Sequence, residues 1–202
     1  MLRPTDVFVE LDDVPAVGMF PNAGPNGRGR SAELEFYHTF RNASFLRVTL
    51  FDQDLKRAEN GSIGTPLYEQ VAQCGARLSY EGALNEDTSF FMRVNFNHAR
   101  DPLDDQDIAQ VPRFGAGLGL HYLNRAGYFI EPLLLLQGKR LERRGSSNQL
   151  DRFSVLNLRV GKRTGLRSSV FVELNNILNS EFSVSRDRQP GRELRIGALH
   201  RF

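Results

Sequence analysis

One cysteine, Cys74, is all that the 202-residue chain contains, so no disulfide can form within it. The chain also lacks an apolar run long enough for a membrane-spanning helix, which needs about 20 residues. Its N-terminus, Met1-Leu2-Arg3-Pro4, is charged at once and has no apolar stretch like the centre of a signal peptide. The composition, 40% hydrophobic and 25% charged, fits either a soluble β protein or a barrel that crosses a membrane with strands.

The charged residues show no excess of one sign. Lys and Arg together number 26 and Asp and Glu 24, for a formal net charge of +2. Lysine occurs only at positions 56, 139 and 162, and the arginines are scattered among acids instead of forming a block. Arg28 and Arg30 form a single Gly-Arg copy, which fits a charged loop end better than a nucleic-acid motif. We therefore expect no nucleic-acid partner.

What the chain does contain is alternation of apolar and polar residues, which is typical of strands with one apolar face. Together with the turn residues, it predicts an all-β, antiparallel, up-and-down fold of about ten strands, and no helix of useful length competes. The expected strands span residues 5–11, 28–40, 43–54, 67–81, 86–99, 112–123, 127–140, 152–162, 166–177 and 192–202.

The two faces of these strands differ in chemistry. Leu46, Val48 and Leu50 alternate with polar residues, and the same pattern recurs in the other strands up to Leu194, Ile196 and Ala198. In a barrel the apolar face meets lipid and the polar face lines the lumen. Charged residues on the polar face are candidates for lining a substrate path, or else for pairing across strands. They are Glu33, Glu35, Arg93, Arg159 and Glu173.

The connections alternate between short and long. The short ones lie at 41–42, 82–85, 124–126 and 163–165, and the long ones at 12–27, 55–66, 100–111, 141–151 and 178–191. Bacterial barrels have short periplasmic turns and long extracellular loops, so this layout favours a transmembrane barrel over a soluble β-meander.

One expected strand departs from the pattern. Residues 127–140 hold a continuous apolar run from Leu133 to Leu136, preceded by Pro132, which cannot donate a ladder hydrogen bond. We expect either a bulge there or an inner face that packs against something.

Several motifs that would indicate chemistry are weak. Gly115, Gly117 and Gly119 resemble a dinucleotide loop only superficially, because Leu120 replaces the third required glycine and no helix follows. On the polar face they would permit bending or close backbone approach. No Gly-x-Ser-x-Gly elbow is present, so the sequence predicts no catalytic residues and no enzyme.

Metal and cofactor sites are not predicted either. Asp101, Asp104, Asp105 and Asp107 fall in one expected loop, but their spacing fails the EF-hand pattern, so a solvated loop is favoured over a calcium site. The four histidines lie on separate strands without metal-ligand spacing.

Read in order, several segments resemble the C-terminal β-barrel region of TonB-dependent outer-membrane receptors. The similar segments are residues 26–36 (NGRGRSAELEF), 111–122 (VPRFGAGLGLHY), 153–161 (FSVLNLRVG) and 170–182 (VFVELNNILNSEF), followed by a terminal strand that ends on Phe202. The resemblance covers residues 26–202 and leaves 1–25 as an incomplete strand and loop.

The resemblance implies an antiparallel transmembrane barrel segment in the outer membrane of a Gram-negative bacterium. It also implies uptake of a small-molecule ligand such as a siderophore or cobalamin, energised by an inner-membrane complex. Leu194, Ile196, Ala198 and Phe202 would form the signal read by the barrel-assembly machinery, although His200 departs from its apolar pattern. The family's signal peptide, coupling box and plug domain are missing and only about half of its strands are present, so we expect a fragment that is not active alone.

Two alternatives remain open at this stage. One is a self-contained ten-stranded outer-membrane barrel that acts as a pore, an adhesin or an enzyme, since small bacterial barrels exist at that size. The other is a soluble β-meander that binds a partner through an exposed edge.

Overall fold

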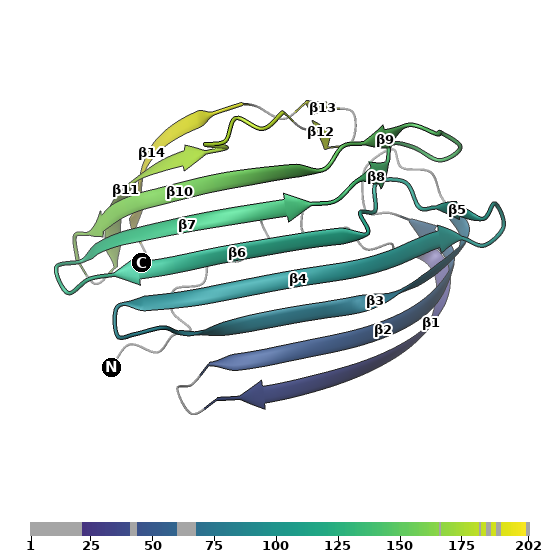
Figure 1. The fold of residues 1–202 in the computed structure, drawn as a ribbon, viewed down its shortest axis with the longest axis horizontal. Coiled ribbons are helices and arrows are strands. Elements are labelled where there is room, and N and C mark those ends of the chain that lie inside the picture. The colour runs from purple at the N-terminus through teal and green to yellow at the C-terminus, as the bar shows by residue number, and fades with distance from the viewer. Residues whose placement is uncertain are drawn as a thin grey trace.

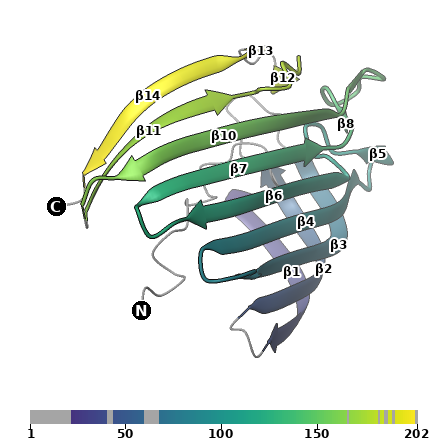
Figure 2. The same cartoon turned by 60° about the vertical axis from the view of Figure 1, so that its left-hand side comes forward.

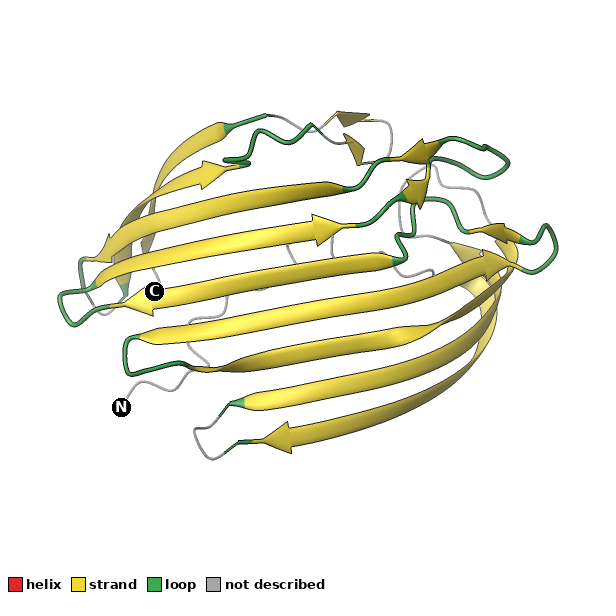
Figure 3. Cartoon of the chain, viewed as in Figure 1, coloured by secondary structure: helices red, strands yellow, loops and turns green. Residues whose placement is uncertain are grey.

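The computed structural model describes residues 22–40, 44–59, 68–165, 167–181, 183–184, 187–188 and 191–200. The expected strand 5–11 and the terminal Phe202 lie outside these residues. All described secondary structure is β-strand (Figures 1 and 3). The described residues contain no helix of the length and hydrophobicity that crossing a membrane requires.

Nine long strands match nine of the ten expected ones. Their bounds are β1 Asn22–Thr39, β2 Phe45–Glu59, β3 Tyr68–Ala83, β4 Thr88–Asp101, β6 Phe114–Leu123, β7 Tyr128–Gln137, β10 Phe153–Arg163, β11 Ser168–Asn175 and β14 Glu193–His200. Five two-residue strands lie in the connections: β5 Gln106–Asp107, β8 Arg140–Leu141, β9 Gln149–Leu150, β12 Ser183–Val184 and β13 Asp187–Arg188.

The long strands form one antiparallel sheet in the order β1-β2-β3-β4-β6-β7-β10-β11-β14, each beside its predecessor in the chain. The sheet curls into a trough (Figure 2). The short turns 84–87 and 124–127 lie at the left of Figure 1, while β5, β8 and β9 belong to the longer connections at the opposite end. The up-and-down topology and the alternating connections are therefore as expected.

The strand register joins the apolar residues of neighbouring strands into one surface. Leu34 pairs with Leu50, Leu50 with Ala76, Ala76 with Phe96, and Phe96 with Phe114. The next row runs through Val48, Leu78, Val94, Ala116 and Leu136. A row nearer the short turns, through Tyr122, Ile130, Val160 and Val172, reaches Ile196 on β14. Many of these side chains are exposed; Ile196 on β14, for example, is 79% exposed. We call this surface the apolar band, and its side of the sheet the outer face.

Aromatic rings lie along both edges of the apolar band. At the short-turn edge, the centroid of Phe40 lies 4.5 Å from that of His38 and 6.2 Å from that of Tyr80, and Tyr80 lies 6.1 Å from Phe90. At the other edge, Phe96 and Phe114 are 5.4 Å apart. Six residues separate Phe90 from Phe96, which corresponds to roughly 20 Å along the strand. Transmembrane barrels have an apolar band about 25 Å tall between aromatic girdles.

Beyond the apolar band, the alternation in β1–β4 changes phase. The outer face of β2 changes from Leu46, Val48 and Leu50 to Asp52, Asp54 and Lys56, while Leu55 on the opposite face becomes buried. The buried residues there form one apolar cluster, made of Leu55, Tyr68, Val71, Ala99, Ile108 and Val111. Because residues 102–113 cover this inner face, the strands extend past the apolar band as a two-layered structure, here called the polar extension.

The phase change corrects one expectation. The sequence predicts a loop over residues 55–66, but β2 continues to Glu59, since Leu55 packs in the apolar cluster of the polar extension. At the far end of β11 the strand stops at Asn175, two residues earlier than expected. Asn176 there adopts a left-handed φ of +52°, and its backbone N–H donates to Asn157 Oδ1 at 2.9 Å.

The unusual strand β7 keeps its register with β10 through Pro132, which pairs with Leu158. Leu133 and Leu135 lie on the inner face and pack against Phe153 and Val155. The continuous apolar run therefore supplies apolar side chains to both faces of the sheet. Of the two explanations expected from the sequence, a bulge or an inner face that packs against other residues, the second is correct.

The sheet is open. Within the described residues β1 and β14 form its two ends, and no ladder joins them. Seven strands lie between β1 and β14 and each neighbouring pair is antiparallel, so β1 and β14 run in the same direction.

Candidate functional site

The five charged residues proposed from the sequence all lie on the inner face, opposite the apolar band. The register puts Glu33 and Glu35 on β1, Arg93 on β4, Arg159 on β10 and Glu173 on β11. Only Arg159 and Glu173 are cross-strand partners. The five therefore form a charged lining along the inner face and do not converge on one site.

The two glutamates of β1 make contacts with β2. Arg47 Nε lies 3.2 Å from Glu35 Oε1, and the Gln53 side chain donates to Glu33 Oε1 at 3.4 Å. Both glutamates are exposed at the open edge of the sheet. Arg93 on β4 lies between Ser79 on β3 and Gly117 on β6, and two strands, β6 and β7, separate β4 from the strand of Arg159.

Arg159 belongs to a denser group on β6, β7, β10 and β11. Its Nη1 lies 3.7 Å from Glu131 Oε2, and Glu131 Oε1 lies 2.8 Å from His121 Nδ1. The Arg159 guanidinium carbon is 3.8 Å from the ring centroid of Phe171. His121 and Glu131 were not among the sequence candidates. Their inner-face position follows from period two, once β7 is read as continuous through Pro132.

Glycines on the inner face accept phenylalanines from the next strand. A Cβ on Gly119 would lie 2.1 Å from Cζ of Phe91, and one on Gly197 would lie 2.5 Å from Cζ of Phe171. Gly161 accepts Phe129 in the same way. At Gly119 the sequence predicts bending or close backbone approach, but the group that approaches is the aromatic ring of Phe91. Gly115 and Gly117 carry no such ring, and a Cβ there would meet only ordinary contacts.

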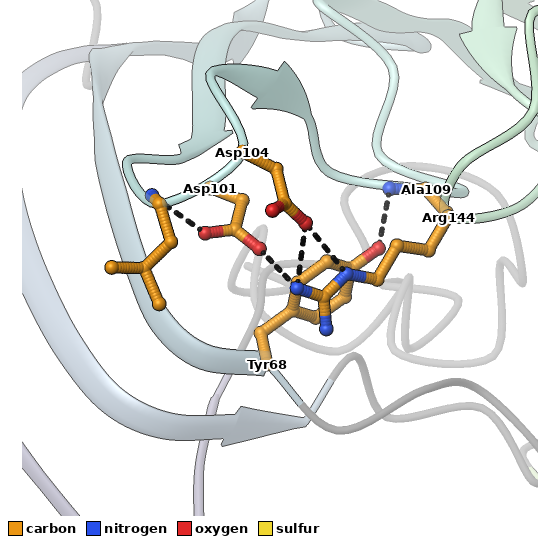
Figure 4. Close-up of polar contacts among 6 residues, drawn as sticks. Tyr68, Asp101, Asp104, Ala109 and Arg144 are labelled. Carbon is orange, nitrogen blue, oxygen red and sulfur yellow. Dashed lines mark hydrogen bonds and ion pairs between the residues drawn. The ribbon is translucent and has the colours of Figure 1, made fainter.

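The long connections 102–113 and 138–152 meet in a polar cluster at one end of the sheet (Figure 4). Arg144 Nη2 lies 2.9 Å from Asp101 Oδ2 and 2.7 Å from Asp104 Oδ2. The Ala109 backbone N–H donates to the Tyr68 hydroxyl at 3.0 Å, and the Arg144 guanidinium carbon lies 5.1 Å from the Tyr68 ring centroid. We call these five residues the loop cluster.

The loop cluster changes the interpretation of the four aspartates at positions 101, 104, 105 and 107. Asp101 is 1% exposed, so a solvated loop is the wrong description for it. The other acids are also paired: Asp105 with Arg100, and Asp107 with Arg113 at 2.9 Å. Arginines thus occupy the carboxylates that calcium would need. The described residues contain no group of three or more His, Cys, Asp or Glu side chains that could hold a metal ion.

The surroundings in the loop cluster also shift the pKa values of two of its side chains, Tyr68 and Arg144. Burial raises the pKa of the Tyr68 hydroxyl above its ordinary value, against the opposing effects of the Ala109 hydrogen bond and of Arg144. The hydrogen bond with Asp104 raises the pKa of Arg144, which stays charged. Nearby, burial lowers the pKa of Arg140, whose guanidinium carbon lies 5.5 Å from the ring centroid of Phe153.

Comparison with solved structures identifies the architecture. The ferric yersiniabactin uptake receptor FyuA from Yersinia pestis matches 86% of this chain with a TM-score of 0.67 at 14% identity. The ferric-catecholate import receptor Fiu from E. coli K12 matches 87% with a TM-score of 0.68 at 13% identity, and the copper transporter OprC matches 87% with 0.69 at 12%. The chain has the fold of a TonB-dependent outer-membrane receptor barrel. This confirms the fold inferred from the ordered sequence segments.

The chain spans 29%, 28% and 31% of the length of FyuA, Fiu and OprC, respectively. These neighbours are an uptake receptor, an import receptor and a transporter. No protein-family model and no curated protein matches the sequence.

Proposed function

We propose that the chain is the C-terminal barrel region of a TonB-dependent outer-membrane receptor and takes part in uptake of a small-molecule ligand such as a siderophore or cobalamin. In this proposal it is a fragment of the transporter, works with a plug domain and the remaining strands, and needs no cofactor of its own. Energy comes from an inner-membrane coupling complex.

The observation that carries this proposal is the continuous apolar band with aromatic edges, backed by a charged inner face. A soluble β protein would cover such a surface, because exposed apolar patches of this extent are rare on soluble monomers. In a membrane, lipid acyl chains cover the apolar band without further protein, and the inner face then lines the lumen of the barrel. The likeness in fold to uptake receptors supports the same proposal.

Each group of residues has a role in this scheme. Glu33, Glu35, Arg93, Arg159 and Glu173 line the lumen and keep it hydrated. Leu194, Ile196 and Ala198, which the register aligns with Leu174, Val172 and Val170, present the apolar side of β14 to the assembly machinery together with Phe202. The loop cluster holds two extracellular loops in a fixed arrangement.

Ligand import tests the proposal. Cells that express only this chain should show no energised uptake of a radiolabelled ferric siderophore or of cobalamin, because the plug and the remaining strands are absent. The chain itself should be recovered in the outer-membrane fraction once it is given a signal peptide. Import by the chain alone, or its recovery as a soluble protein, would overturn the proposal.

A further inference from the structure

The polar extension carries a group of cations on its outer face, on the same side of the sheet as the apolar band. Arg28 on β1 is the direct cross-strand partner of Lys56 on β2, and Arg30 follows two residues later on the same face. All three side chains are exposed. None of them forms a hydrogen bond or an ion pair with another residue of the described part of the chain.

Direct pairing of like charges is unfavourable in an antiparallel sheet. The cross-strand neighbour of Arg30 is Asp54, whose carboxylate accepts a hydrogen bond from Gln70 at 3.0 Å, and Asp52 lies one row nearer the apolar band. These acids lie below the Arg28–Lys56 pair, so they do not separate its two charges. An anion held between Arg28 and Lys56 would relieve the repulsion.

The height of this pair above the apolar band indicates where the anion comes from. Leu34 and Leu50, the last large apolar residues of the band on β1 and β2, are 54% and 45% exposed. Arg30 lies four residues beyond Leu34 and Arg28 six residues beyond it. With strands tilted by about 40°, these separations correspond to heights of roughly 10 and 15 Å.

From this arrangement we infer that the outer face of the polar extension binds phosphate groups on the headgroup of an anionic glycolipid in the outer leaflet, through Arg28, Arg30 and Lys56. The acyl chains of that lipid pack against the apolar band below. Guanidinium and ammonium groups bind phosphate through charge-assisted hydrogen bonds, and basic clusters next to membrane-spanning segments recruit anionic lipids. This inference rests on the proposed function, which places the apolar band in the outer membrane.

Binding of a defined lipid to the full chain tests the inference. The probes are lipopolysaccharide and the same material after enzymatic removal of its phosphates, each titrated into the chain in neutral detergent micelles. The phosphorylated form should bind at least tenfold more tightly. The triple variant R28Q/R30Q/K56Q should lose roughly a hundredfold in affinity for it, at about fivefold for each cation near an anionic lipid surface.

The matched control removes three cations near the opposite end of the sheet, the exposed Arg125 and Arg167 and the half-buried Arg163, as R125Q/R163Q/R167Q. It should bind within about twofold of the unsubstituted chain. Equal affinity for the two lipid forms, or equal loss in both triple variants, overturns the inference. If the R28Q/R30Q/K56Q variant does not fold, the salt dependence of binding by the unsubstituted chain decides the matter, and affinity that does not fall between 50 mM and 500 mM salt overturns it. A chain that fails to associate with micelles at all contradicts the proposed function instead.

Discussion

At the scale of single residues, Arg144 connects the two long loops at the extracellular end of the proposed barrel. It contacts Asp101, which is almost wholly buried, and Asp104, and it stacks on the ring of Tyr68. Asp101 also accepts the backbone N–H of Leu103 at 3.0 Å. Removing Arg144 would therefore leave a buried carboxylate without its counter-charge, which is the costly way to break an ion pair.

We expect R144Q to destabilise the loop cluster by about 2–3 kcal/mol. Removing one partner of a fully buried ion pair lowers the stability of a protein by roughly 3–5 kcal/mol. We expect a smaller loss here because a third of the Arg144 side chain is exposed. Hydrogen exchange at the Ala109 amide, which donates to Tyr68, reports the loss. R113Q is the matched control, because the Arg113–Asp107 pair is largely exposed and should contribute under about 1 kcal/mol. Equal acceleration of exchange in both variants would contradict the assignment.

Tyr68 gives the loop cluster a dependence on alkaline pH. Its pKa in the folded chain is raised, mainly by burial, so above pH 10 the unfolded chain loses this proton first. The contribution to stability is therefore complete below about pH 10, the ordinary tyrosine pKa, and is lost as the pH rises through the folded pKa. The free energy of unfolding should fall as the pH rises above about 10, and it should fall less in Y68F. Parallel pH profiles for the two proteins would refute this.

At the scale of strands, period two made most of the sheet predictable. Leu46, Val48 and Leu50 alternate so regularly that the strand and its apolar face follow from the sequence alone. The phase change after Leu50 could not be found in this way, because Leu55 becomes buried only when residues 102–113 fold over it. The ion pairs of Arg144 depend on two loops about 40 residues apart, and no local pattern encodes such a contact.

The assignment of faces can be tested on β4, where Val94 and Asn95 are consecutive. Val94 pairs with Leu78 and Ala116 on the outer face, whereas Asn95 pairs with Arg77 and Gly115 on the inner face. Arginine near the midplane of the lipid-facing surface costs about 2–4 kcal/mol, so V94R should lower the stability of the chain refolded into lipid vesicles by that amount. N95R should change it by less than about 1 kcal/mol, because the inner face is hydrated. Urea titration measures both, and equal losses would contradict the assignment.

At the scale of the whole molecule, strand direction restricts how the barrel can close. The nine strands alternate in direction, so β1 and β14 are parallel to each other at the two open ends. Joining them directly, within one chain or between copies that share one orientation in the membrane, would require a parallel ladder in an otherwise antiparallel sheet. Antiparallel closure needs an odd number of additional strands, consistent with the even strand numbers of bacterial single-chain barrels.

The two possible sources of those strands give different results with the chain alone. If a longer protein supplies them, as the proposed function requires, the refolded chain keeps two unpaired edges, which are costly in lipid. The open sheet should then associate with micelles without closing and show no compact, heat-modifiable band on a cold SDS gel, and deleting residues 1–21 should change nothing. If the expected strand 5–11 supplies a single tenth strand, the full chain should give a compact band that the deletion abolishes. That second result would replace the receptor fragment with a self-contained ten-stranded barrel.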